Sequence, residues 1–360
     1  MGLFSRKPQS PATPPPDDDA PGWDAITAHF DAAYPGQKPL HYASILKWRL
    51  GGDDPLDGIS VYRAATPLPH WHFVTYGYSD LYATAPVADP DQDSGYGIEM
   101  TLRLVDPSAL DPNAQPPSWV LNMLQNLARY VFRSGNVIYA KHHLDANGPI
   151  AVGANTQLTA LAFTDDPIGT PLHTPAGLVR LVQGVGITAQ ELTYAVEWNT
   201  DGVLDVIGRR WPRGLTIMDR PGLDSDPALV ALVEEGIKRE GSSLAATQVE
   251  TLAIEQSPDG LVVTLSALAP PTLARSVASR LPFGREIVLY GISQAVQFIP
   301  EPPTGPVRTP FQGDEVAEIS LTPAGVAALA GLPQTPGDHR LEAVPGVIWR
   351  LVDTDIQRSN

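Results

Sequence analysis

The sequence predicts an α+β protein with two domains, each a mixed or antiparallel sheet packed with helices. At 360 residues the chain is longer than one ordinary hydrophobic core requires. Its residues are 43% hydrophobic and 18% charged, which is typical of a folded chain. Segments with the two-residue period of strands alternate with amphipathic helices bounded by proline and glycine.

The first domain is predicted to span residues 22–245. The leader before it, residues 1–21, is rich in proline and aspartate and has little to bury. A helix follows, because apolar residues recur at helical spacing before a Pro-Gly stop (Trp23, Ile26, Phe30 and Ala33). A second helix begins after two prolines and ends at Gly135, with an apolar stripe at Trp119, Met123, Leu127 and Val131.

Between these two helices the sequence predicts a strand over residues 97–105. Apolar side chains alternate there with Glu99, Thr101 and Arg103, which is the period of a half-buried strand. Gly95 and Gly97 indicate a bulge or a close backbone approach where the strand begins.

Three further helices are expected in the first domain. Thr188 and Glu191 form a capping box at the start of one, and a second covers residues 200–208. The third has Asp226 as its N-cap, Pro227 at its first position and Gly241 at its end, and is expected to close the domain.

Residues 250–360 are predicted to form a smaller α+β domain. Its expected elements are strands over 261–268 and 285–299 with a short helix between them, a proline-rich loop over 300–310, a helix capped by Thr322, and a strand over 346–352.

The charge and cysteine content argue against several classes of function. With 24 Lys and Arg against 40 Asp and Glu, the formal charge is −16, so neither nucleic acid nor a membrane is an expected partner. A basic partner would be attracted. The absence of cysteine excludes disulfides, thiolate nucleophiles and cysteine-bound metals. The N-terminus does not resemble a signal peptide, so a cytoplasmic protein is expected.

The sequence contains no standard catalytic motif such as a P-loop, a G-x-S-x-G elbow or H-E-x-x-H. One enzymatic alternative stays open, a metal-assisted hydrolase in which His70 and His72 meet His142, His143 and Asp145. No metal or cofactor is predicted, because isolated histidines are more often structural. Asp80, Glu99, Asp165 and Asp166 are interpreted as solvated loop and turn acids.

Several segments resemble, in order and spacing, hallmark segments of the suppressor of fused family. They include HWHFVTYGYSDLY (70–82), SGYGIEMTLRL (94–104), PPSWVLNMLQNLARYVFRSGN (116–136) and ELTYAVEWNTDGVLDVI (191–207). The resemblance covers residues 22–245 and is looser over 250–360. It implies a non-enzymatic binding protein. Animal members hold Gli transcription factors by clamping a short peptide as an added strand between two domains, and bacterial relatives include immunity proteins that neutralise polymorphic toxins.

The resemblance also implies a peptide site. One aromatic residue of the family site corresponds to Tyr130 in this chain. At the position of a second aromatic residue this chain has Ile138, and at the position of the acidic residue that pairs with the partner's histidine it has His142. The histidine that follows in the family is also present here, as His143. Because the carboxylate is missing, Gli-type specificity is not carried over. Together with the strand around Asp145, these residues are the expected partner-binding edge.

We therefore expect a protein or peptide partner, held in a cleft between the domains. The favoured role is an immunity protein that neutralises a toxin, because the chain is short and resembles the bacterial branch. A general regulatory scaffold is the alternative within the same class of function.

Overall fold

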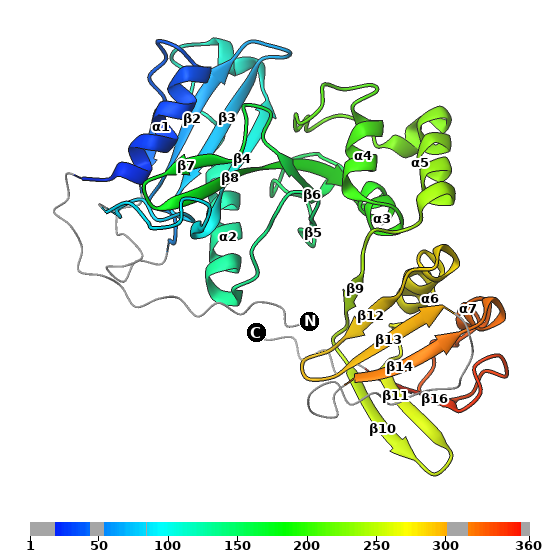
Figure 1. Cartoon of the computed structure of the whole chain (residues 1–360). Helices are drawn as coiled ribbons and strands as arrows, with labels where there is room; N and C mark the ends of the chain where they lie inside the picture. Colours follow the sequence, from blue (N-terminus) through cyan, green and yellow to red (C-terminus); the bar gives the residue numbers. More distant parts are fainter. Residues whose placement is uncertain (1–18, 44–53, 84, 301–315, 354–360) are drawn as a thin grey trace. The chain divides into compact units, whose positions relative to one another are not determined.

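The computed structural model describes residues 19–43, 54–83, 85–300 and 316–353 (Figure 1). These residues fall into two compact units, one within Met1–Leu192 and Val203–Leu229 and the other within Thr193–Gly202 and Val230–Asn360. The domain boundary predicted between residues 245 and 250 remains a prediction. Most of the predicted leader, and the proline-rich loop beyond Pro300, lie outside the described residues.

The first unit is built on an eight-stranded mixed sheet, which agrees with the predicted α+β class. The strand order is β1-β2-β3-β4-β8-β6-β5, and β7 pairs with β8 off this path. Strands β4 and β8 run parallel, and the other pairs are antiparallel. The strands are β1 (Leu40–Ala43), β2 (Gly58–Ala64), β3 (His70–Tyr76), β4 (Asp93–Val105), β5 (His143–Asp145), β6 (Leu158–Asp165), β7 (Leu172–Thr174) and β8 (Gly177–Thr188).

Helices cover both faces of this sheet. Helix α2 (Ser118–Ser134) packs on one face against alternate side chains of the central strands, including Phe73 and Leu102. Helix α1 (Pro21–Ala33) packs on the other face through Ile26 and Phe30. The short 3-10 helix η2 (Pro107–Leu110) follows β4.

The prediction that β4 is half-buried is therefore wrong. Its polar side chains Glu99, Thr101 and Arg103 are 0%, 0% and 7% exposed. They lie on the sheet face that α1 and the residues following it cover, so their polar atoms need partners inside the protein. Those partners come from distant parts of the chain.

Helix α2 ends where the sequence predicts, but its buried stripe is shifted. Gly135 caps it with a φ of 73°, and the Gly135 N–H donates to the carbonyl of Val131 at 2.8 Å. The fully buried residues are Val120, Leu124, Leu127, Ala128 and Val131, whereas Trp119 and Met123 are only half-buried. The helix thus presents a wider and slightly rotated apolar face to the sheet.

The glycine pair near the start of β4 forms the predicted bulge. The pairing of β4 with β8 shifts register between Asp93 and Ile98. Gly95 has a φ of 57°, and a Cβ added there would lie 2.7 Å from the carbonyl oxygen of Tyr78. Glycine is therefore required by both backbone conformation and space.

The three later helices form over the residues predicted for them. They are α3 (Ala189–Glu197), α4 (Thr200–Ile207) and α5 (Pro227–Glu240), with the 3-10 helix η3 (Leu223–Ser225) before α5. However, most of α3 and most of α5 fall in the second unit and not in the first. The capping box is present: the Thr188 N–H donates to Glu191 Oε2 at 2.9 Å, and the Glu191 N–H donates to Thr188 Oγ1 at 3.2 Å. Glu191 also accepts two hydrogen bonds from the buried Arg220 at 2.6 and 2.5 Å, a pairing that local sequence does not reveal.

The second unit holds two four-stranded sheets that share one hydrophobic core. The sheets have the orders β10-β11-β16-β15 and β14-β13-β12-β9, and each mixes parallel and antiparallel pairs. The strands are β9 (Ala246–Gln248), β10 (Leu252–Ser257), β11 (Gly260–Ser266), β12 (Ile287–Tyr290), β13 (Ala295–Pro300), β14 (Val316–Leu321), β15 (Gly337–His339) and β16 (Val347–Val352).

Helices α6 (Pro270–Ala278) and α7 (Pro323–Leu329) contribute to the same core, through Leu273 and Leu329 among others. The 3-10 helix η4 (Leu281–Phe283) follows α6. As predicted, Thr322 caps α7, because its hydroxyl accepts from the Gly325 N–H at 3.0 Å.

Candidate functional site

Strand β5 forms an edge of the first sheet (Figure 1). It is the last strand in the sheet order, and His143, Leu144 and Asp145 lie opposite Ala162, Leu161 and Ala160 of β6. The structure therefore places Asp145 on an edge strand.

The backbone of β5 alternates between facing β6 and facing away from it. The carbonyl of His142 accepts from the Phe163 N–H at 2.9 Å, and the Ala146 N–H donates to the carbonyl of Thr159 at 3.0 Å. In an antiparallel pair every second residue faces the neighbour, so the N–H and C=O of Asp145 point away from β6. An edge of this kind can pair with an extended segment of another chain.

A turn and a bulge lead into β5. The His142 N–H donates to the carbonyl of Tyr139 at 3.2 Å, which closes the turn. The Lys141 N–H donates to the carbonyl of Phe163 at 2.7 Å, so Lys141 and His142 together oppose Phe163. This is a G1 bulge, and its first residue, normally glycine, is Lys141 with a φ of 75°.

Replacing Lys141 by glycine is expected to raise the free energy of unfolding by about 0.5 to 1 kcal/mol, because glycine adopts a positive φ without steric cost. Urea unfolding of the intact chain measures this. Lys141→Ala is the matched control, since it removes the same charge and keeps the Cβ. An equal gain from alanine would contradict the bulge interpretation.

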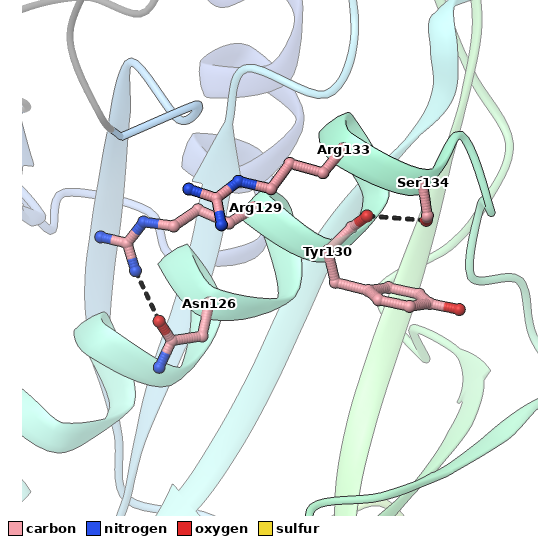
Figure 2. Close-up of a pocket in the computed structure, with 5 residues that line it drawn as sticks. All are labelled: Asn126, Arg129, Tyr130, Arg133 and Ser134. Atoms are coloured by element: carbon pink, nitrogen blue, oxygen red, sulfur yellow. Dashed lines mark hydrogen bonds between the residues drawn. The ribbon is translucent and has the colours of Figure 1, made fainter. Parts of the chain in front are cut away.

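Tyr130 lies on the exposed side of α2, one turn before its end. Its side chain is 42% exposed, which places it at the surface rather than in the core. It lines a shallow depression with Asn126, Arg129, Arg133 and Ser134 (Figure 2). In Figure 2 the Tyr130 ring points away from the two guanidinium groups, so the depression has an aromatic side and a basic side.

The other predicted contact residues take different positions. Ile138 is 4% exposed and belongs to the core beneath α2, so it supports the surface instead of meeting a partner. His142 is exposed and its Nδ1 lies 3.3 Å from the backbone nitrogen of Tyr139, whereas His143 is half-buried on β5. Burial lowers the pKa of both histidines below 6.5, so both are neutral at pH 7.

The structure does not bring the four histidines together. His70 and His72 lie on β3, and His143 lies on β5, with β4, β8 and β6 between them in the sheet. At roughly 4.8 Å per strand this separation is far too large for one metal ion. The predicted alternative of a metal sphere shared by His70, His72, His142 and His143 is therefore wrong.

His72 instead belongs to a buried polar network on the α1 side of the sheet. Asp166, which follows β6, accepts from His72 Nε2 at 3.1 Å, from Thr101 Oγ1 at 2.6 Å and from Arg103 Nη2 at 2.7 Å. Because the carboxylate only accepts, Nε2 carries the proton and Nδ1 accepts from the Tyr34 hydroxyl at 2.7 Å. The neutral imidazole is thus fully hydrogen-bonded.

This network predicts a pH-dependent stability. Burial lowers the pKa of His72 from 6.5 to about 4, opposed by its hydrogen bond to Asp166. Between pH 6.5 and 4 the unfolded chain takes up a proton that the folded chain does not, so stability is lost as the pH falls. Compared with the His72→Gln variant, the free energy of unfolding of the natural chain should fall by about 3 kcal/mol more between pH 6.5 and pH 4.

The measurement is the difference in unfolding free energy between the two proteins at several pH values. The difference cancels the contribution of Glu99, whose pKa burial raises to about 7 and which acts in the opposite direction. A pH-independent difference would contradict the assignment of His72 as a buried neutral residue.

The prediction that Glu99 and Asp166 are solvated is also wrong. Glu99 is 0% and Asp166 is 2% exposed. Glu99 accepts from the Thr75 hydroxyl at 2.7 Å, from the backbone of Gly77 at 2.9 Å and of Ser79 at 3.0 Å, and from the Ser79 hydroxyl at 2.7 Å. These donors hold β3, the turn after it and β4 together, which is a structural role.

The sequence interpretation did not identify the basic side of the depression. Arg129 pairs with Asp54 and with Asn126 Oδ1, and Arg133 lies exposed in the last turn of α2. The available signal was the spacing of Arg129 and Arg133, four residues apart and thus on one helix face. Within the described residues, no helix is both long and apolar enough to cross a membrane.

The sequence comparisons match a family and two curated relatives. The family described as Suppressor of fused protein (SUFU) matches residues 52–221. The Suppressor of fused homologs of Homo sapiens and Mus musculus are each 34% identical over 249 residues, covering 64% of this chain and 50% of each relative. The chain therefore spans about half the length of the curated relatives it matches.

Solved structures show the same similarity. The crystal structure of Drosophila Suppressor of Fused superposes with a TM-score of 0.77 at 22% identity, covering 94% of this chain and 98% of that one. The Sufu-Fu complex crystal structure matches with a TM-score of 0.55 at 30% identity, covering 60% of this chain and 98% of that one.

Proposed function

This chain belongs to the suppressor of fused family, and from that premise we propose that it is a non-enzymatic module that binds a protein partner. The partner contributes an extended segment that pairs with the outer edge of β5 and contacts Tyr130.

The observation that carries this proposal is the outward-facing backbone of β5 close in sequence to an exposed aromatic side chain. Asp145 directs its N–H and C=O away from β6, and Tyr130 is exposed on the helix before it. Backbone pairing supplies affinity and neighbouring side chains supply specificity in this mode of recognition. The relative in the Sufu-Fu complex supports it, since that protein is bound to another protein.

Site-specific photocrosslinking in the native cell tests the proposal. A benzophenone amino acid at position 130 should capture one defined partner, because a large exposed aromatic in a binding surface lies against the bound segment. The same amino acid at Arg340, an exposed residue of the second unit, is the control. Equal yields of the same product from both positions, or no product from position 130, would contradict the proposal.

We propose that the partner is a toxin and that the chain is an immunity protein in the bacterial cytoplasm. The strongly acidic composition supports this role, because its field would steer a basic enzyme toward the chain. Co-expression with the product of a neighbouring toxin gene tests it: the host should survive with this chain and die without it. A captured partner without toxic activity would favour the alternative of a regulatory scaffold.

A further inference from the structure

The surface around Tyr130 differs in charge from the rest of the chain. Asp and Glu make up 40 of 360 residues, yet residues 112–144 contain neither, from the loop before α2 to the middle of β5. The same stretch carries Arg129, Arg133 and Lys141. The depression around Tyr130 is therefore lined by two arginines and no acidic residue, in a chain with a formal charge of −16.

The arginines of this surface differ in how far they are already neutralised. Arg129 is half-buried and paired with Asp54, with 31% and 41% of the two side chains exposed. Arg133 is exposed and forms no ion pair with any described residue. Since a guanidinium group offers five donors, Arg133 retains its capacity to bind carboxylates.

The histidines do not account for this positive charge. Burial lowers the pKa of His142 and His143, so they are neutral at pH 7 and can act as hydrogen-bonding groups. The positive charge of the surface at neutral pH therefore comes from Arg133, with contributions from Arg129 and Lys141.

We propose that the segment that binds beside β5 is acidic and places a carboxylate against Arg133, with a non-polar side chain against Tyr130. This inference rests on the proposed function and adds the chemistry of the partner. Charge complementarity supports it, because a carboxylate of the segment can pair with the exposed guanidinium of Arg133, which has no ion pair with any described residue. The inference concerns only the bound segment, so it is compatible with a partner that is basic elsewhere.

A first test uses labelled peptides of alternating glutamate and threonine, glutamine and threonine, or lysine and threonine, titrated against the full chain by fluorescence anisotropy. The glutamate peptide should bind on the order of tenfold more tightly than the glutamine peptide, since hydrogen bonds to charged groups are stronger than neutral ones. The preference should weaken as salt is added.

Arg133→Glu should abolish the preference for the glutamate peptide. Arg209→Glu is the matched control, because it makes the same charge change at an exposed arginine of the same unit outside the depression, and it should retain the preference. The proposal is overturned if the glutamine or lysine peptide binds as tightly as the glutamate peptide, or if both variants lose affinity equally.

A second test separates this inference from the proposed function. Mass spectrometry of the product captured through position 130 identifies the partner segment in contact with α2. A segment rich in Asp and Glu is the expected result. A captured segment without acidic residues would overturn the inference and leave the proposed function intact, whereas the absence of any captured segment would overturn both.

Discussion

Replacing Asp166 by alanine is expected to lower the free energy of unfolding of the first unit by about 3 to 5 kcal/mol. The reason is that the carboxylate satisfies Arg103, Thr101 and His72 at once in a region where its own side chain is 0% exposed. Removing it leaves a buried guanidinium without its counterion. Urea unfolding measures this loss of free energy. Hydrogen exchange of the β3 amides shows which unfolding transition belongs to the first unit.

Asp205→Ala is the matched control for this experiment. Asp205 pairs with Arg213 on the surface of the same unit, with 57% and 52% of the two side chains exposed. The same change from carboxylate to methyl should cost about 0 to 1 kcal/mol there. Equal losses at Asp166 and Asp205 would mean that the network does not depend on its buried charge.

Replacing Asp145 by proline is expected to weaken binding of the captured partner on the order of tenfold to a hundredfold. Proline lacks the N–H that points away from β6, and its ring blocks the approach of an added strand. The hydrogen bonds between β5 and β6 stay intact, because their donors in β5 lie at neighbouring positions such as Ala146. Titration of the purified partner by calorimetry measures the change.

Asp145→Ala controls for the side chain in that experiment. Both variants lose the hydrogen bond in which Asp145 Oδ1 accepts from the Asn147 N–H at 2.8 Å, but only proline loses the backbone donor. Alanine should therefore bind nearly as well as the natural chain. If alanine binds as poorly as proline, the side chain and not the strand edge carries the interaction.

Helix positions were predictable from sequence because helices depend on nearby residues. The Thr188–Glu191 capping box, the Asp226 N-cap and the Gly135 C-cap each act within a few positions, and each appears in the structure. The glycine-dependent bulge near the start of β4 was predictable for the same reason, since a positive φ is a local requirement.

The buried polar face of β4 was not predictable from its alternating pattern. Arg103 and Thr101 look like residues of an open face, and only their pairing with Asp166, 63 and 65 positions away, permits their burial. Sequence periodicity shows which side chains share a face, but it does not show what covers that face. The same limit applies to the strand order, which separates His72 from His143.

The candidate site was predictable only in part. The resemblance indicated Tyr130 and the strand around Asp145, and the structure places the first on an exposed helix face and the second on a sheet edge. It also indicated Ile138, where the loop after α2 turns an aliphatic side chain into the core. The spacing of Arg129 and Arg133 places them on one helix face, but it does not show that Arg133 is exposed beside Tyr130.

Amide hydrogen exchange of β5, with and without the captured partner, tests the central claim most directly. If an extended segment pairs with the outer edge of β5, the amide of Asp145 should become strongly protected in the complex, because its N–H gains a backbone acceptor. Unchanged exchange at Asp145, with protection elsewhere in the chain, would contradict the account.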